Sequence, residues 1–223
     1  MRYVIGIDEV GRGSLAGPVA VCAVCIPTNL KLSARGGSAS GGKTKNLKLG
    51  KLRDSKKLIA DRRERWFEYF SANKKVRYAI ARVHPRKIEE INISRAANLA
   101  ASRAYKQLFA RHEIDAEKCA VFLDGGLYLG NKRKSVKEYG AHTVIKGDEK
   151  ILAITIASII AKVVRDRWMR KLSKKFPGYG FEIHSGYGTK RHIAAIKKFG
   201  PSSAHRLTFL RNIKNKISKI KNK

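Results

Sequence analysis

The stretch over residues 149–174 limits most strongly how this chain can fold. We expect a helix here whose first three turns are apolar on every side. A helix of this kind must be buried. Ala153, Ala157 and Ala161 recur at every fourth position and form a ridge of small side chains that allows close packing. The longest apolar run, residues 151–161, is too short to span a bilayer.

The rest of the chain predicts strands that are first joined as hairpins and later alternate with helices. The expected strands cover residues 3–8, 19–26, 76–83, 119–123 and 142–146. The other expected helices cover about 61–72, 94–112 and 189–199, with Ser94 and Thr189 as N-caps. This order predicts an α/β fold, in which helices flank a mixed central sheet and a small helical C-terminal part covers about 176–210.

The length of 223 residues suits a single catalytic domain over 1–223 with a substantial core. A basic Gly/Ser-rich segment at about 30–52 is interpreted as a solvated insertion rather than a nucleic-acid flap. Residues 127–141 form a polar, basic excursion, and the basic tail at 211–223 is either a short amphipathic helix or a frayed end. The roles of these three segments stay open.

The charge of the chain indicates its partners rather than its fold. The formal net charge is +32, with 49 basic and 17 acidic residues, so a phosphate backbone is the expected partner. An anionic membrane competes for this role, but we expect no membrane association because no run reaches spanning length. The three cysteines lie in apolar surroundings and predict buried thiols in a reducing cytoplasm, and no signal peptide is expected.

Four carboxylates, Asp8, Glu9, Asp124 and Asp148, each lie at the C-terminal end of an expected strand or just beyond it. Strand ends of one sheet can converge on a common site. Oxygen ligands without histidine or cysteine suit Mg²⁺ or Mn²⁺, and a pair of such ions suits displacement at phosphorus. Any one of these acids alone is better interpreted as a turn carboxylate, but four at strand ends favour a metal site.

Asp8 and Glu9 raise a geometric difficulty. Consecutive residues of a regular strand point to opposite faces, so both acids reach one site only if the chain bends. Gly11 makes a bend possible. We therefore expect the chain to leave regular strand geometry at Glu9.

Three functions fit these features: a metal-dependent nuclease, a basic nucleic-acid-binding protein without chemistry, and a phosphate-binding enzyme that uses the glycine turn. The carboxylates favour the first over the second, because a pure binder gains nothing from acids that face phosphate. The third is weakened because residues 11–16 lead into a strand pattern and not into a helix.

The chain resembles the ribonuclease HII family over nearly its whole length. The motifs that carry this resemblance are Ile7-Asp8-Glu9-Val10-Gly11-Arg12-Gly13 with Leu15-Ala16-Gly17-Pro18, Asp54-Ser55-Lys56-Lys57-Leu58, Asp124-Gly125, Lys146-Gly147-Asp148, Ala157-Ser158-Ile159-Ile160-Ala161-Lys162-Val163 with Arg165-Asp166, His184-Ser185-Gly186-Tyr187-Gly188-Thr189, and His205-Arg206-Leu207-Thr208-Phe209. Each motif alone is weak, but their occurrence together in this order is highly specific.

The resemblance implies a ribonuclease H-like fold and a metal-dependent endonuclease that acts in DNA replication and repair. The implied substrates are RNA–DNA hybrids, cut in the RNA strand, and duplex DNA with single ribonucleotides, cut on their 5′ side. The implied products carry 3′-hydroxyl and 5′-phosphate ends. The enzyme is expected to be a monomer that uses two Mg²⁺ or Mn²⁺ ions. The Gly-Arg-Gly form and the absence of a long N-terminal extension argue against the sister type, ribonuclease HIII.

The resemblance also implies roles for individual residues. The four carboxylates become the catalytic metal ligands. The residues expected to bind substrate are Gly11, Arg12, Gly13, Ser55, Lys56 and Tyr187. In this interpretation the glycine backbone approaches the ribose 2′-OH, Arg12 binds the neighbouring phosphate, and the Tyr187 ring packs on the next sugar. For Arg165, Asp166 and the histidines at 184, 192 and 205, we favour structural roles.

Overall fold

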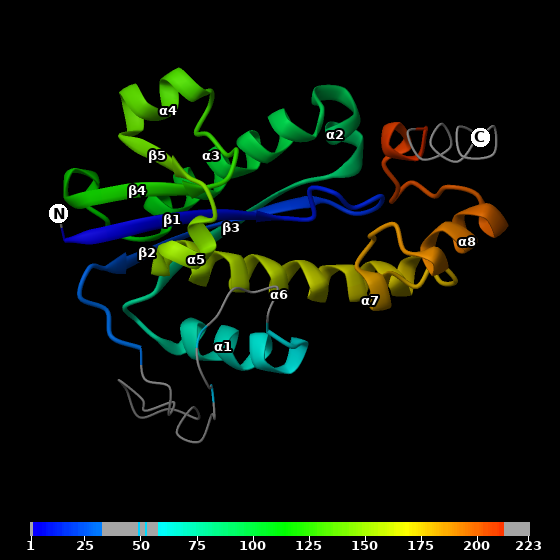
Figure 1. The fold of residues 1–223 in the computed structure, drawn as a ribbon, viewed down its shortest axis with the longest axis horizontal. Helices are drawn as coiled ribbons and strands as arrows, with labels where there is room; N and C mark the ends of the chain where they lie inside the picture. The colour runs from blue at the N-terminus through cyan, green and yellow to red at the C-terminus, as the bar shows by residue number, and fades with distance from the viewer. Residues whose placement is uncertain (1, 33–48, 50–51, 53–57, 212–223) are drawn as a thin grey trace.

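Five strands form one mixed sheet at the centre of the molecule (Figure 1). The computed structural model describes residues 2–32, 49, 52 and 58–211. The strands are β1 (Tyr3–Val10), β2 (Val19–Pro27), β3 (Arg77–Val83), β4 (Cys119–Asp124) and β5 (Ala141–Val144), in the order β3-β2-β1-β4-β5. β2 pairs antiparallel with β1 and β3, whereas β4 pairs parallel with β1 and β5. The predicted α/β class with a mixed sheet is confirmed.

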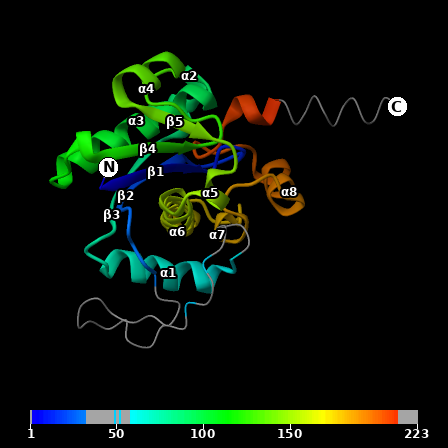
Figure 2. The same cartoon turned by 60° about the vertical axis from the view of Figure 1, so that its left-hand side comes forward.

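The buried helix α6 (Leu152–Lys175) lies between the sheet and α1 (Ala60–Ala72), as the end-on view in Figure 2 shows. Ala153, Ala157 and Ala161 are fully buried. A Cβ added at Gly6 of β1 would lie 2.3 Å from backbone atoms of Ala153 and Ile154, so only glycine permits this approach. The prediction of a buried helix with a small-residue ridge is confirmed.

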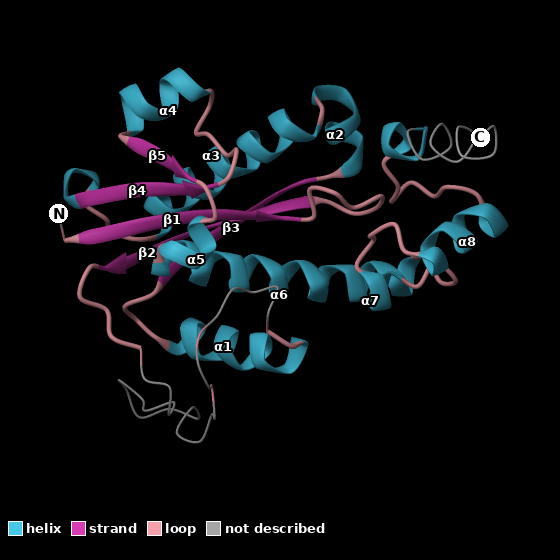
Figure 3. Ribbon diagram, viewed as in Figure 1, coloured by secondary structure: helices cyan, strands magenta, loops and turns pink. Residues whose placement is uncertain are grey.

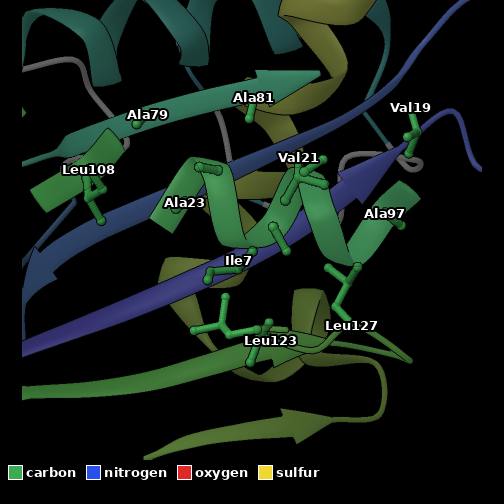
Figure 4. Close-up of a cluster of buried hydrophobic side chains, with 14 of the residues drawn as sticks. Ile7, Val19, Val21, Ala23, Ala79, Ala81, Ala97, Leu108, Leu123 and Leu127 are labelled. Atoms are coloured by element: carbon green, nitrogen blue, oxygen red, sulfur yellow. The ribbon is translucent and has the colours of Figure 1, made fainter. Parts of the chain in front are cut away.

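The other face of the sheet is covered by α3 (Ile93–Arg111), which follows the short helix α2 (Pro85–Ile91). Side chains alternate along β1, so Ile5 and Ile7 face α3 while Gly6 and Asp8 face α6. Figure 4 shows the resulting apolar cluster, in which Ile7 packs near Leu123 of β4. The sheet thus has a packed core on each face.

Several local expectations are corrected. Asn92, and not Ser94, caps α3, because the Asn92 side chain accepts from the N–H of Arg95. The predicted polar excursion contains a helix, α4 (Lys132–Tyr139), and the predicted strand at 142–146 ends two residues early (Figure 3). The cap at Thr189 is confirmed by its hydrogen bond from the N–H of His192.

The C-terminal part follows α6 after its last turn and is helical, as predicted (Figure 1). It contains the predicted helix α8 (Lys190–Phe199) and a short helix that was not predicted, α7 (Phe181–His184). Its apolar cluster includes Ala16 of the glycine-rich segment, Met169 of α6 and Phe181 of α7. This cluster therefore ties the C-terminal part to the segment after β1. The helices of the described ranges all fall short of the length or hydropathy that a bilayer-spanning segment needs.

The cysteines differ in burial. Cys22 and Cys25 are buried on opposite faces of β2, one in each core cluster, as expected for a separation of three in a strand. Cys119 is only half-buried at the start of β4, so the prediction of a buried thiol is wrong there.

Candidate active site at the ends of β1 and β4

A pocket of about 230 Å³ opens where β1 and β4 part. Pairing between β1 and β4 ends at Ile7 and Leu123, whereas pairing between β1 and β2 continues to Val10 and Ala20. The last residues of β1 therefore have no neighbouring strand on one side. The pocket is lined by Asp8, Glu9, Val10, Gly11, Arg12, Gly13, Asp124, Ser158, Lys162 and Tyr187.

Asp8 enters this pocket from the α6 side of the sheet. Its side chain is 5% exposed, and its Oδ1 accepts a 2.7 Å hydrogen bond from the backbone N–H of Glu9. Burial raises the pKa of Asp8 well above its usual range, and the negative charges of Glu9 and Asp124 raise it further, while a hydrogen bond with Ser158 lowers it. Three carboxyl groups therefore interact electrostatically at this point.

Glu9 lines the same pocket although β1 does not bend at this residue. The ladder with β2 runs regularly through Glu9 and Val10, so the expected departure from strand geometry is wrong. Both acids reach the pocket because it lies beyond the last β1–β4 pair and is open to both faces of the sheet. The positive φ of +84° occurs later, at Gly11.

The two oxygens of Glu9 differ in their surroundings. Oε1 lies 3.4 Å from a guanidinium nitrogen of Arg12, whereas Oε2 is buried and has no hydrogen-bond partner within the part of the chain that the structure describes. Burial raises the pKa of Glu9, against the opposing effect of the Arg12 charge. A buried carboxylate oxygen without a partner is costly, so Oε2 suits a positively charged ligand.

Asp124 and Asp148 lie on neighbouring segments. Asp124 ends β4, and its Oδ1 accepts a 2.6 Å hydrogen bond from the N–H of Gly147. Asp148 follows in the short helix α5 (Gly147–Lys150), where it is 5% exposed and its backbone carbonyl accepts from the hydroxyl of Thr155. Asp148 does not line the pocket, so the structure brings together three of the four predicted carboxylates.

The pocket has the donor chemistry of a hard cation. Within the described ranges, no group of three or more His, Cys, Asp or Glu side chains is arranged so that it could hold a metal ion. Nevertheless, Asp8, Glu9 and Asp124 share one pocket, and Glu9 contributes the buried oxygen that lacks a partner. Carboxylate oxygens of this kind fit Mg²⁺ or Mn²⁺.

The two glycines of the turn after β1 differ in what surrounds them. Gly11 is buried, and a Cβ there would lie 2.1 Å from Nε of Arg165. Gly13 is exposed, and a Cβ there would meet nothing within 4 Å. Gly11 is therefore required by the fold, whereas Gly13 leaves open space beside the pocket.

The Arg12 side chain lines the pocket and has two side-chain partners among the described residues. Besides its contact with Glu9, one guanidinium nitrogen donates to the hydroxyl of Ser94 at 3.2 Å. The side chain is still 37% exposed. Ser94, which the sequence predicts as a cap, thus contacts a candidate substrate-binding residue.

Tyr187 lies at the edge of the same pocket and is 36% exposed. Its ring is 5.6 Å from the guanidinium carbon of Arg165 and 5.8 Å from the ammonium of Lys162. The other two predicted substrate-binding residues, Ser55 and Lys56, fall outside the described residues.

Sequence reasoning overlooked two pocket residues, Ser158 and Lys162 of α6. They are four positions apart and therefore share one face of the helix. The available signal was a polar side chain at each position in the largely apolar first half of the helix. Lys162 donates a 2.8 Å hydrogen bond to Asp166, which also accepts from Ser185 and lies 3.9 Å from Arg63. Asp166 thus has the expected arginine partner, and its closest contacts are with Lys162 and Ser185.

The structural role expected for Arg165 is confirmed. Its guanidinium is fully buried and donates to the carbonyls of Pro18, Ala16 and Ser185 and to the hydroxyl of Ser14. These contacts join α6 to the glycine-rich segment after β1. The Arg165 side chain also lies directly against Gly11, so it supports the turn that borders the pocket.

The structural roles expected for the three histidines are also confirmed by their hydrogen bonds to the backbone. His184 donates to the carbonyl of Tyr179 and accepts from the N–H of Gly186. His192 donates from Nδ1 to the carbonyl of Tyr187, and its Nε2 lies 3.1 Å from Nε2 of His205. This network links the core of the C-terminal part to the backbone of the pocket residue Tyr187.

Comparisons with known proteins agree with this architecture. The model of the family described as Ribonuclease HII matches residues 5–212. Ribonuclease HII of Pelagibacter ubique is 42% identical over 94% of this chain and 96% of its own length. Ribonuclease HII of Caldicellulosiruptor bescii is 38% identical over 95% of this chain and 88% of its own length.

A solved structure is similar as well. The complex of PCNA with ribonuclease HII from Archaeoglobus fulgidus contains a chain that superposes with a TM-score of 0.63 at 27% identity, over 92% of this chain and 93% of that one. The family model and the relatives cover nearly the whole length described above. The chain therefore belongs to the ribonuclease HII family and is a ribonuclease H endonuclease.

Proposed function

We propose that this chain hydrolyses the RNA strand of RNA–DNA hybrids and cuts on the 5′ side of single ribonucleotides in duplex DNA. The products would carry 3′-hydroxyl and 5′-phosphate ends. The observation that carries this proposal is the shared pocket, in which Asp8, Glu9 and Asp124 lie beside the Gly11-Arg12-Gly13 turn and Tyr187. Residues that would hold a reactive phosphate and residues that would contact a ribose are thus adjacent.

The residues of the pocket would divide the work between chemistry and recognition. Asp8, Glu9 and Asp124 would hold Mg²⁺ or Mn²⁺ in the pocket, and Asp148, which follows the Gly147 that donates to Asp124, would complete the set from outside the present lining. Two such ions would activate the attacking water and stabilise the leaving 3′ oxygen.

Recognition would rest on the turn and on Tyr187. The open space at Gly13 lets a sugar approach the backbone, whose polar groups can bond a 2′-OH. Arg12 has an exposed guanidinium for a phosphate oxygen. The half-exposed ring of Tyr187 offers a flat apolar face for the next sugar. The large positive charge of the chain favours binding of the duplex as a whole.

The deciding experiment is cleavage of an end-labelled DNA duplex that contains one ribonucleotide, with Mg²⁺, with Mn²⁺ and with a chelator. We expect one cut immediately 5′ of the ribonucleotide that disappears with the chelator. A product with a 2′,3′-cyclic phosphate, or equal cleavage in the chelator, would contradict the proposal. An all-DNA duplex and a continuous RNA–DNA hybrid complete the substrate series.

A further inference from the structure

Arg206, like Arg165, is a fully buried arginine, and its guanidinium contacts the backbone of the turn after β1, residues 11–17. It donates to the carbonyl of Gly11 at 2.8 Å, to the carbonyl of Arg12 at 2.9 Å, and twice to the carbonyl of Gly17. Four N–H···O bonds from one planar group therefore hold both ends of the turn. No other side chain in the described ranges is seen to bond the carbonyls of Gly11 and Arg12.

These bonds determine which way two peptide groups face. In a trans peptide, the carbonyl of one residue and the N–H of the next point in opposite directions. The carbonyls of Gly11 and Arg12 point toward Arg206, so the N–H groups of Arg12 and Gly13 point away from it. Both residues line the pocket, and neither N–H has a hydrogen-bond partner among the described residues. Two free donors thus belong to the part of the turn that borders the pocket.

We propose that Arg206 is a positioning residue for ribose recognition, because it directs the N–H groups of Arg12 and Gly13 toward the sugar of the bound nucleotide. This inference rests on the proposed function. Donors that are fixed in advance bind better than donors that must be ordered on binding. The backbone of Arg206 is itself fixed, since its N–H donates to the carbonyl of Leu15 at 2.8 Å.

The nearby chain adds further support for a rigid arrangement. Ala16 and His205 form an isolated bridge, and Gly17 donates to the carbonyl of Ala204. Two residues after Arg206, Thr208 donates through both its N–H and its hydroxyl to Glu89 of α2. The guanidinium is thus held between the turn and the segment from which it projects.

The test compares Arg206→Lys with Phe70→Leu, a core change in α1 far from the turn. Lysine keeps the charge but lacks the planar fork that reaches several carbonyls at once. Affinity is measured in chelator for a duplex with one ribonucleotide and for the matched all-DNA duplex. We expect the ratio of the two affinities to fall about tenfold in Arg206→Lys, with a higher KM for cleavage. Phe70→Leu should lower the melting temperature but keep the ratio.

An unchanged affinity ratio in a folded Arg206→Lys protein would overturn the inference. If that variant does not fold, amide exchange of the wild-type protein decides. The ribonucleotide-containing duplex should slow exchange at Arg12 and Gly13 more than the all-DNA duplex does, and equal exchange with both would also overturn it. Failure of the proposed function looks different, since the wild-type protein would then leave the labelled duplex uncut.

Discussion

The carboxylate of Asp124 accepts a 2.6 Å hydrogen bond from the backbone N–H of Gly147. This contact joins the end of β4 to the first residue of α5, so it fixes the start of the segment that carries Asp148. One oxygen of Asp124 therefore has a structural partner, while the carboxylate as a whole borders the pocket. The same side chain serves the fold and the candidate site.

Substitutions at Asp124 should separate these two roles. Asp124→Asn keeps an oxygen that can accept from Gly147 but loses the negative charge, so we expect near wild-type thermal stability and almost no cleavage. Asp124→Ala also loses the hydrogen bond and should cost about 1–2 kcal/mol of stability in addition. Thermal melts and cleavage assays check this pair. Equal stability of the two variants would contradict the structural role.

Asp8→Asn should lower the rate of cleavage by about 10³-fold, while binding of the hybrid persists. Because Asp8 is buried beside Glu9 and Asp124, removal of its charge should also stabilise the metal-free protein by about 1 kcal/mol. Mg²⁺ or Mn²⁺ should raise the melting temperature of the wild-type protein more than that of the variant. Asp61→Asn, an exposed acid on α1, is the matched control. Cleavage by Asp8→Asn at the wild-type rate would exclude the metal assignment.

The two turn glycines should respond differently to substitution. Gly13→Leu adds a side chain into open space, so stability should not change, but cleavage at a single ribonucleotide should fall because the sugar is kept away. Gly11→Ala requires a positive φ and displaces Arg165, and should lower stability by about 1–3 kcal/mol. Full activity of Gly13→Leu on the single-ribonucleotide duplex would count against the recognition role.

Acid should destabilise the C-terminal part through His192. Burial lowers the pKa of His192 to about 4, and neighbouring His184 and His205 also have lowered pKa values because they are buried. The unfolded chain then binds more protons than the folded one between about pH 6.5 and pH 4. Stability is thus full above about pH 6.5 and falls with pH, by up to about 1.4 kcal/mol per unit for each histidine.

Denaturant melts across this range measure the effect. His192→Asn should be less stable at neutral pH but should show a flatter dependence, because asparagine does not titrate. His142→Asn, an exposed histidine on β5, should keep the wild-type slope. A wild-type slope in His192→Asn would show that other groups cause the acid sensitivity.

Affinity for nucleic acid should fall steeply with salt. With a formal net charge of +32, the chain is expected to release many counterions on binding, so affinity should fall by about 10³-fold or more between about 50 mM and about 200 mM salt. Fluorescence anisotropy with a labelled hybrid measures the slope. A nearly flat titration would mean that the basic residues do not contact phosphate.

The sequence was most informative where a pattern has one physical solution. A helix that is apolar on all sides must be buried, and α6 is. The regular strand geometry at Glu9 was not predicted, because the sequence of β1 does not reveal where its pairing with β4 ends. The end of that pairing determines whether side chains from both faces of the sheet can reach the pocket. Ser94 was misplaced because both it and Asn92 are good caps, and the choice depends on tertiary contacts.

The contacts of Arg206 were beyond sequence reasoning for a different reason. Arg206 and Gly11 are separated by 195 positions in the chain. Periodicity and capping patterns relate only neighbouring residues, so they cannot predict a contact between residues so far apart. Ser158 and Lys162 were visible as polar positions in α6, but their approach to the pocket depends on how the helix is rotated against β1. That rotation is set by the contact between Gly6 and Ala153.

This contact also limits how the chain can change in length. Ala153 meets β1, Ser158 and Lys162 border the pocket, and Arg165 supports the turn, all from one continuous helix. One residue inserted between Ala153 and Ser158 would rotate the later positions by about 100° and shift them by about 1.5 Å. If Ala153 keeps its contact with β1, the pocket contacts of Ser158 and Lys162 and the support from Arg165 would then be lost together. Insertions and deletions should therefore be tolerated in connecting segments such as the one around α4, and excluded from the first half of α6.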